Sequence, residues 1–221
     1  MGLAIFDLDH TLLNGDSDHA WGEFLVRHKV VDPEFYRRQN DHFYELYKLS
    51  QLDIMEYLAF ALEPLTRFTL PELELMHRQF MHEFIIPMRQ PKADQLIQKH
   101  REQGDFLLII TATNRFVTAP IARALGVDDL LATDPEIQGD RYTGRVSGTP
   151  CYREGKVERL HQWLQDTDHD LEESYFYSDS INDLPLLQEV THPVVVDGDE
   201  RLRAEAEQRD WPMISLKESN G

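Results

Sequence analysis

The sequence contains one cysteine, Cys151, among its 221 residues. A single cysteine cannot form an internal disulfide, and such sparse use is typical of a reducing compartment. A catalytic thiol needs a base and an orienting group, and neither lies near Cys151 in the sequence. We therefore expect Cys151 to be a structural or surface residue.

Long apolar runs are also missing. No stretch approaches the roughly 20 apolar residues that cross a bilayer. Met1 leads into the first apolar segment without the basic region of a signal peptide. These absences predict a cytoplasmic protein that does not contact a membrane.

Basic residues are few, with 22 Lys and Arg against 40 Asp and Glu and a net charge of −18. Nucleic acids are bound by clustered Lys and Arg, so this balance argues against a nucleic-acid partner. If the substrate is an anion, a metal ion and a few cations must reverse the charge at its site. The hydrophobic content of 41% is sufficient for a real core.

An acidic pair, Asp7 and Asp9, directly follows the apolar run Leu3-Ala-Ile-Phe6. Such a run is typical of a strand buried on both faces of a parallel sheet. Residues i and i+2 of an extended chain point to the same side, so one cavity must hold both carboxylates. That is costly unless a cation lies between them or one keeps its proton. The first carboxylate can then attack phosphorus while a protonated neighbour gives its proton to the departing alkoxide.

Two structural alternatives apply to this pair. A calcium loop that starts at Asp7 would need Gly at its sixth position, where Leu12 stands, and Glu at its twelfth, where Asp18 stands. An acidic turn that caps a helix stays open for either Asp alone, but it does not explain the pair.

The remaining pattern predicts an α/β fold, a doubly wound parallel sheet with an inserted α-helical cap. Apolar runs at 106–110, 130–133, 174–178 and 193–196 alternate with helical patterns, and turn residues indicate a hairpin at 139–144. Residues 19–87 carry helical patterns without a strand signal. We therefore expect a core of residues 1–14 and 89–221 and a cap of residues 15–88. The aromatic side chains expected mainly in the core of this cap are Trp21, Phe43, Tyr44, Tyr47, Tyr57 and Phe60.

Ligands of such sheets bind at the carboxyl ends of the strands. Thr111 follows the second strand and offers a hydroxyl to a phosphoryl oxygen, although it can equally be a helix cap. Asp179 and Asp183 bracket the turn after the fourth strand, in which Asn182 also lies. An Asx-rich turn is an open alternative for Asn182 and Asp183.

A magnesium site is the expected use of these acids. Carboxylates of Asp7 and Asp179, one backbone carbonyl, a phosphoryl oxygen and waters would complete it. Asp183 and Asn182 would orient these ligands or contact the substrate. Lys156 begins a helix, where a cation opposes the dipole, so pairing with Asp7 and the phosphoryl group would explain it; a surface lysine is the alternative.

Taken together, the motifs resemble those of the haloacid dehalogenase (HAD) superfamily phosphatases. Asp7-Leu-Asp-His-Thr-Leu-Leu13 matches the first motif, Thr111 the second, Lys156 the third and Ser178-Asp-Ser-Ile-Asn-Asp-Leu184 the fourth. The helical insertion is similar to the cap of the phosphoserine-phosphatase-like subgroup, subfamily IB. The resemblance implies a Rossmann-like core.

The same resemblance implies a role for each motif residue. Asp7 would be the nucleophile and Asp9 the general acid and later base. Thr111 and Lys156 would bind the phosphoryl group. Mg²⁺ would bind to Asp7, the carbonyl of Asp9 and Asp179.

Departures from the subgroup concern the substrate. Asp16 stands where phosphoserine phosphatases carry Glu, and their carboxylate-binding Arg would fall near Phe60 or Ala61. Ala112 and Thr113 replace a Gly-Gly pair. We therefore predict that phosphoserine is not the main substrate. The expected pocket residues are His10, Asp16, His19 and Arg115.

The leading hypothesis is an Mg²⁺-dependent phosphomonoesterase that hydrolyses a small phosphorylated metabolite through an aspartyl-phosphate. Histidinol phosphate and sugar phosphates are candidates. One alternative is a receiver-type signalling module phosphorylated on Asp, which has no cap. Another is a phosphotransferase or mutase, which passes the phosphoryl group to an alcohol instead of water.

Overall fold

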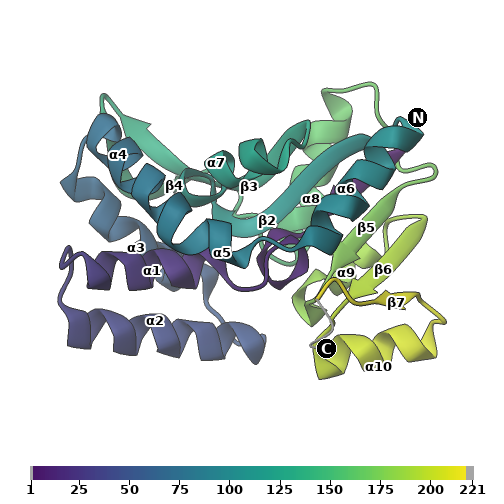
Figure 1. Ribbon diagram of the computed structural model, residues 1–221, viewed down its shortest axis with the longest axis horizontal. Coiled ribbons are helices and arrows are strands. Elements are labelled where there is room, and N and C mark those ends of the chain that lie inside the picture. The colour runs from purple at the N-terminus through teal and green to yellow at the C-terminus, as the bar shows by residue number, and fades with distance from the viewer. Residues whose placement is uncertain (1, 218–221) are drawn as a thin grey trace.

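The computed structural model describes residues 2–217. Its strands are β1 (Leu3–Phe6), β2 (Phe106–Asn114), β3 (Asp129–Gln138), β4 (Arg141–Ser147), β5 (Tyr175–Ser178), β6 (His192–Val196) and β7 (Met213–Ile214). They form one seven-stranded sheet in the order β4-β3-β2-β1-β5-β6-β7 (Figure 1). Every neighbouring pair is parallel except β3 and β4. The predicted α/β class and doubly wound sheet are confirmed.

The first strand shows how both faces of the sheet are covered. Side chains alternate along a strand, so Leu3 and Ile5 join one apolar cluster, whereas Ala4 and Phe6 join the other. The cluster of Phe6 includes residues of α6 (Pro91–Gln103) and α7 (Arg115–Leu125) and extends into the helical segment between β1 and α6. The helices that supply the cluster of Ile5 are α8 (Glu154–Gln165), α9 (Leu184–Leu187) and α10 (Glu200–Gln208). Burial on both faces explains why the whole run is apolar.

The segment between β1 and α6 is helical, as predicted. Its helices are α1 (Ser17–Arg27), α2 (Pro33–Lys48), α3 (Ile54–Leu62), α4 (Leu70–Phe80) and α5 (Ile86–Met88), with helical turns at Glu63–Arg67 and Met81–Ile85. They gather on one side of the molecule in Figure 1. Side chains of Asp16, Asp32 and Asp53 accept backbone N–H groups at three helix starts, and Glu72 accepts from the N–H of Thr69 at a fourth. These caps explain where each helix begins.

The two ends of the helical segment lie side by side. Leu13 and Arg89 form an isolated antiparallel bridge, and the N–H of Asn14 donates to the carbonyl of Met88 over 2.8 Å. The chain therefore leaves and re-enters the sheet layer at one place. The division into a cap of residues 15–88 and a core on either side stays a prediction.

The hairpin of β3 and β4 is longer than the sequence predicted. The apolar run at 130–133 is only the inner part of β3, because Asp134, Pro135 and Glu136 interrupt the pattern while the backbone stays extended. Beyond the sheet, β4 packs against α3 and the Glu63–Arg67 turn. The carbonyl of Asp140 also accepts the N–H of Leu70 over 2.8 Å. The outer hairpin is thus tied to the helical segment.

Two other features concern the predictions from composition. No helix within residues 2–217 has both the length and the apolar character needed to cross a membrane; the cytoplasmic location stays a prediction. Cys151 is fully buried, and burial raises the pKa of its thiol to about 12. That thiol is protonated near neutral pH, in agreement with a structural role.

Candidate active site

The site begins where the chain leaves β1. The N–H of Asp7 still donates to the carbonyl of Tyr177 in β5, over 2.9 Å. Residues Leu8–Leu12 then form a single wide turn that holds Asp9 in an extended conformation (φ −75°, ψ 136°) and His10 at φ 57°. Asp7 is only 6% exposed. The turn therefore fixes both acids at the carboxyl end of the central strand.

Lys156 lies between two buried carboxylates. Its Nζ donates to Asp7 Oδ1 and to Asp183 Oδ2, each over 2.8 Å. Ser178 Oγ also donates to Asp183, over 2.7 Å. Burial alone would lower the pKa of Lys156, but Asp183 and Asp7 outweigh it and the pKa is raised. Lys156 is thus a permanent cation, and it needs the pairing that the helix position suggested.

The residue before Lys156 is a glycine, Gly155, and the backbone there packs closely against another segment. A Cβ on Gly155 would lie 2.1 Å from the carbonyl oxygen of Pro150. Only glycine permits that approach. The sequence reasoning did not single out Gly155, although a glycine directly before the motif lysine is a visible signal.

Asp7 and Asp179 have the chemistry of a divalent-cation site. The Thr11 hydroxyl lies 3.4 Å from Asp7 Oδ2 and 3.3 Å from Asp179 Oδ1, so one donor serves both carboxylates. Burial first, then the charges of Asp7 and Asp183, raise the pKa of Asp179 well above its usual range. Burial likewise raises the pKa of Asp7 to about 7, against the opposing charge of Lys156. A cation between the two would favour the ionised form of both.

The donor set is small. Within residues 2–217 no group of three His, Cys, Asp or Glu side chains forms a metal cluster, and Asp183 is bonded to Lys156 and Ser178. Two carboxylates with a backbone carbonyl and waters nevertheless suit Mg²⁺, which keeps several waters in its shell. The residues present therefore fit the predicted ion.

Asp9 is held by two donors. Its Oδ1 accepts the N–H of Ser17 over 2.6 Å, and its Oδ2 accepts the hydroxyl of Thr113 over 2.8 Å. Burial, then the charge of Asp16, raises the pKa of Asp9 to about 6 despite those bonds. A carboxyl that titrates near neutral pH is suited to give and take a proton.

Thr111 lies within β2 and not after it, because the strand continues to Asn114 through a shift of register. The apolar run 106–110 therefore predicted only the regular part of the strand. Thr111 is buried, and its Oγ1 accepts the N–H of Thr113 over 3.2 Å. Both threonines line the same pocket as Asp7 and Asp9.

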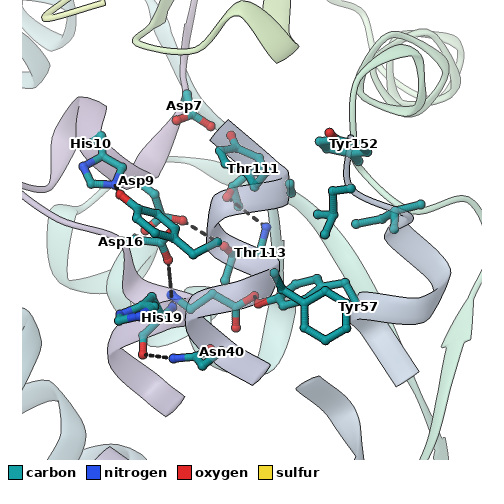
Figure 2. A pocket seen from close by; sticks show the side chains of 17 residues that line it. Asp7, Asp9, His10, Asp16, His19, Asn40, Tyr57, Thr111, Thr113 and Tyr152 are labelled. Carbon is teal, nitrogen blue, oxygen red and sulfur yellow. Dashed lines mark hydrogen bonds between the residues drawn. The ribbon is translucent and has the colours of Figure 1, made fainter. Parts of the chain in front are cut away.

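This pocket connects the strand ends to the helical segment. Its lining consists of Asp7, Asp9, His10, Asp16, Asp18, His19, Asn40, Phe43, Tyr44, Tyr47, Leu52, Ile54, Tyr57, Thr111, Ala112, Thr113 and Tyr152. Figure 2 shows Asp7 at one end and Asn40 and Tyr57 at the other. We call Asp7, together with three neighbours that lie outside the lining, Lys156, Asp179 and Asp183, the lysine end. We call four lining residues, Asp16, Asp18, Tyr44 and Tyr57, the tyrosine end. Four aromatic residues expected in the cap core, Phe43, Tyr44, Tyr47 and Tyr57, thus line the pocket instead.

Asp18 was not predicted as a functional residue. It is 8% exposed, and its Oδ2 accepts the hydroxyl of Tyr57 over 2.5 Å. Its Oδ1 accepts the amide of Asn114 over 3.4 Å. Burial raises the pKa of Asp18 to about 7, the Tyr57 hydroxyl opposes this, and Asp16 and Asp9 add to it. The sequence signal was a second acid, after Asp16, in the segment that follows the first motif.

Other predicted residues have mixed outcomes. His10 and His19 line the pocket, as expected, and His10 Nε2 lies 3.0 Å from the Tyr44 hydroxyl. Arg115 was wrongly placed, because its guanidinium pairs with Asp134 outside the lining of this pocket. Helix α7 turns that side chain towards β3, a direction that sequence spacing does not show.

Asn182 is used by protein contacts. Its amide donates to the carbonyl of Tyr47 over 3.1 Å, and its Oδ1 accepts the hydroxyl of Tyr152 over 3.4 Å. It is 4% exposed and is not among the residues that line the pocket. Asn182 therefore joins the end of α2 to the strand-end loops, and its predicted role in orienting the metal ligands or contacting the substrate stays a prediction.

Comparison with known proteins identifies the class. The profile of the haloacid dehalogenase-like hydrolase family matches residues 4–188, so the chain belongs to this family. A phosphoserine phosphatase structure with bound substrate has a TM-score of 0.71 at 15% identity, covering 96% of this chain and 92% of that one. That likeness confirms the fold.

Three similar proteins each cover 97% of the chain. A histidinol-phosphatase of Neisseria meningitidis is 45% identical over 219 residues, 97% of this chain and 99% of that protein. A protein of unknown function from Bordetella pertussis has a TM-score of 0.91 and 46% identity, covering 97% of this chain and 98% of that one. A phosphoserine phosphatase of Mycobacterium tuberculosis is 30% identical over 97% of this chain and 70% of its own length. The protein is an enzyme, a phosphatase of the haloacid dehalogenase-like family that acts on a phosphorylated substrate.

Proposed function

We propose that the protein is an Mg²⁺-dependent phosphomonoesterase that works through an aspartyl-phosphate. The observation that carries this proposal is the buried bridge of Lys156 between Asp7 and Asp183, at the carboxyl end of the central strand. The lysine restrains Asp7 and leaves a carboxylate at the base of the pocket. That is the arrangement expected of a positioned oxygen nucleophile.

Each side chain of the site then has one task. Asp7 attacks phosphorus, and Asp9 in its protonated form gives its proton to the departing alkoxide. The free alcohol leaves, Asp9 takes a proton from water, and the water hydrolyses the acyl phosphate. Thr111 and Lys156 hold phosphoryl oxygens. Mg²⁺, held by Asp7, Asp179 and the carbonyl of Asp9, would neutralise charge on the transferring group.

The proposed substrate is L-histidinol phosphate. The name of the Neisseria relative supports it. The pocket supports it independently, because none of the described residues that line it is Lys or Arg. Phosphoserine carries a carboxylate, which would lie among Asp16 and Asp18 with no Lys or Arg side chain in the lining. Histidinol phosphate carries an ammonium and an imidazole and has no carboxylate.

The test is phosphate release by the purified full chain from L-histidinol phosphate, L-phosphoserine and p-nitrophenyl phosphate, with Mg²⁺ and with excess EDTA. We expect kcat/KM for histidinol phosphate to exceed that for phosphoserine by at least about 100-fold, since an unpaired buried charge costs several kcal/mol. EDTA should abolish every rate. Preferential hydrolysis of phosphoserine would overturn the proposed substrate, and full activity in EDTA would overturn the proposed metal dependence.

The covalent intermediate has its own test. The Asp9→Asn variant lacks the base that activates water. With p-nitrophenyl phosphate, whose phenolate leaves without needing a proton from Asp9, the acyl phosphate should therefore accumulate and be trapped by acid quench. A variant that turns over without any trapped phosphate on the chain would contradict the two-step route. Added alcohols should not divert phosphate from water, whereas a phosphotransferase or mutase would form a new ester.

A further inference from the structure

The two ends of the pocket differ in how their negative charge is balanced. At the lysine end, Lys156 neutralises part of the charge of Asp7 and Asp183. At the tyrosine end, the partners of Asp18 are a neutral phenol and a neutral amide. Asp16 and Asp9 add like charge. No lining residue among those described supplies a Lys or Arg to this end.

The two acids of the tyrosine end are not equivalent. Asp16 Oδ1 accepts the N–H groups of Asp18 and His19, over 2.9 and 2.8 Å, and so caps helix α1. The Asp18 side chain does not cap a helix in this way, and it is only 8% exposed. A carboxylate that buried is costly without a counter-charge. Tyr57, which holds it, comes from a different helix, α3.

The surroundings suit a cation rather than a second proton donor. Tyr44, Tyr47, Tyr57 and Phe43 line the same pocket, and aromatic faces attract positive charge. Lys48 Nζ already lies 4.8 Å from the centre of the Tyr44 ring. A ligand cation in the pocket would meet both the rings and the carboxylate.

We infer that Asp18, fixed by Tyr57 and Asn114, is the specificity-determining residue that binds a positively charged nitrogen of the substrate's leaving group. This inference rests on the proposed function for the identity of the reaction. The inference goes beyond the proposed function because it assigns the selection of the leaving group to one buried carboxylate of the helical segment. The nitrogen is an ammonium or an imidazolium, and the substrate analogues below distinguish these two sources.

The first experiment compares Asp18→Asn with the wild type on two substrates. Asn keeps the size and an oxygen for Tyr57 but removes the charge. KM for L-histidinol phosphate should rise roughly 10- to 100-fold, the usual loss for a hydrogen bond to a charged group. The kcat/KM for p-nitrophenyl phosphate, which has no cation, should stay within about threefold.

A matched control removes one acid from the same region without touching the pocket. Glu45 is an exposed member of α2 that pairs with Lys48. Glu45→Gln should leave KM for L-histidinol phosphate and kcat/KM for p-nitrophenyl phosphate within about twofold of wild type, because surface pairs contribute little. Equal effects of Asp18→Asn on both substrates, or no effect on either, would overturn the inference.

The second experiment needs no variant, so a failure of Asp18→Asn to fold does not stop the test. N-acetyl-histidinol phosphate removes the ammonium charge, and 2-amino-3-phenylpropyl phosphate removes the imidazole. The wild-type enzyme should show a KM at least tenfold higher for the analogue that lacks the bound cation. If both analogues match L-histidinol phosphate, Asp18 binds neither nitrogen and the inference is overturned.

Binding of the product alcohol gives a readout that does not depend on turnover. L-Histidinol titrated into the wild-type chain by calorimetry should bind at least tenfold more tightly than into folded Asp18→Asn; equal affinity would overturn the inference. Failure of the proposed function looks different. In that case the wild type with Mg²⁺ releases no phosphate from any of the esters.

Discussion

The lysine end and the tyrosine end of the pocket are both rich in buried carboxylate, but they are stabilised differently. At the lysine end the protein supplies its own cation, and Lys156 is only 2% exposed between its two partners. At the tyrosine end Asp18 has only neutral donors. The first arrangement is complete without ligand, whereas the second is left with an uncompensated charge.

This difference separates two requirements of a phosphatase. The group that reacts must be fixed before substrate arrives, because positioning supplies much of the rate. The group that selects the leaving alcohol gains by being costly when empty and satisfied when filled. The predictions that follow test this division, starting with the largest effect.

Asp7→Asn should abolish turnover. Removing the nucleophile of a covalent mechanism costs roughly 10⁴-fold or more in kcat. The variant keeps Lys156 paired with Asp183, so its fold should persist. Steady-state phosphate release and a thermal melt check both statements. Near-normal turnover would remove the covalent mechanism and with it the special status of the lysine end.

Lys156→Met should strongly destabilise the chain. It leaves Asp7 and Asp183 buried without their cation, and breaking a buried pair in this way costs about 3–5 kcal/mol. Urea unfolding at pH 7 measures the loss. Lys99→Met on the exposed face of α6 is the matched control, expected within about 0.5 kcal/mol of wild type. Similar losses for both variants would mean that the bridge is not what stabilises this end.

Asp18→Asn should stabilise the fold, in contrast to Lys156→Met, and the gain in stability should depend on pH. The pKa of Asp18 is raised from 3.8 to about 7 in the folded chain, so its ionisation opposes folding. The penalty is fully present above about pH 7, declines between pH 7 and pH 4, and is absent below the unfolded pKa. Without ligand, the variant should therefore be more stable by about 1–3 kcal/mol at pH 8, with the gain lost towards pH 4.

Thermal midpoints measured across that pH range check the prediction for Asp18. A variant that is less stable than wild type at pH 8 would show that Asp18 is already satisfied by its neutral partners. The contrast between the two ends of the pocket would then not exist.

The smallest effect is expected at Thr113, which lies between the two ends. Its hydroxyl favours the ionised form of Asp9, so Thr113→Val should raise the pKa of Asp9. The alkaline limb of the pH–rate profile should shift upward by up to about one unit, with kcat/KM falling by about tenfold or less. Thr149→Val removes a hydroxyl bond to Glu158 outside the pocket and should leave the profile unchanged. A downward shift in Thr113→Val would contradict the assignment.

The sequence predicted the structure best where a strand or helix depends on residues that are neighbours in the chain. The apolar run before Asp7 specified a doubly buried strand, and the lack of a strand signal over residues 19–87 specified a helical segment. It predicted less where a pattern is broken by a local polar stretch, as in β3 beyond Thr133. Aromatic residues of α2 and α3 were assigned to the interior because burial alone does not distinguish a core from a pocket wall.

By itself, the amino-acid sequence determined that acids follow the buried strands, that the sheet is doubly wound and that a long helical segment intervenes. Only the tertiary structure decided which charges meet. The sequence suggested the pairing of Lys156 with Asp7, but it did not show that Lys156 also pairs with Asp183 or that Tyr57 bonds Asp18, 39 positions away. Strand and helix periodicity act over a few residues, whereas the choice of a counter-charge in a dry interior depends on packing between segments far apart in the chain.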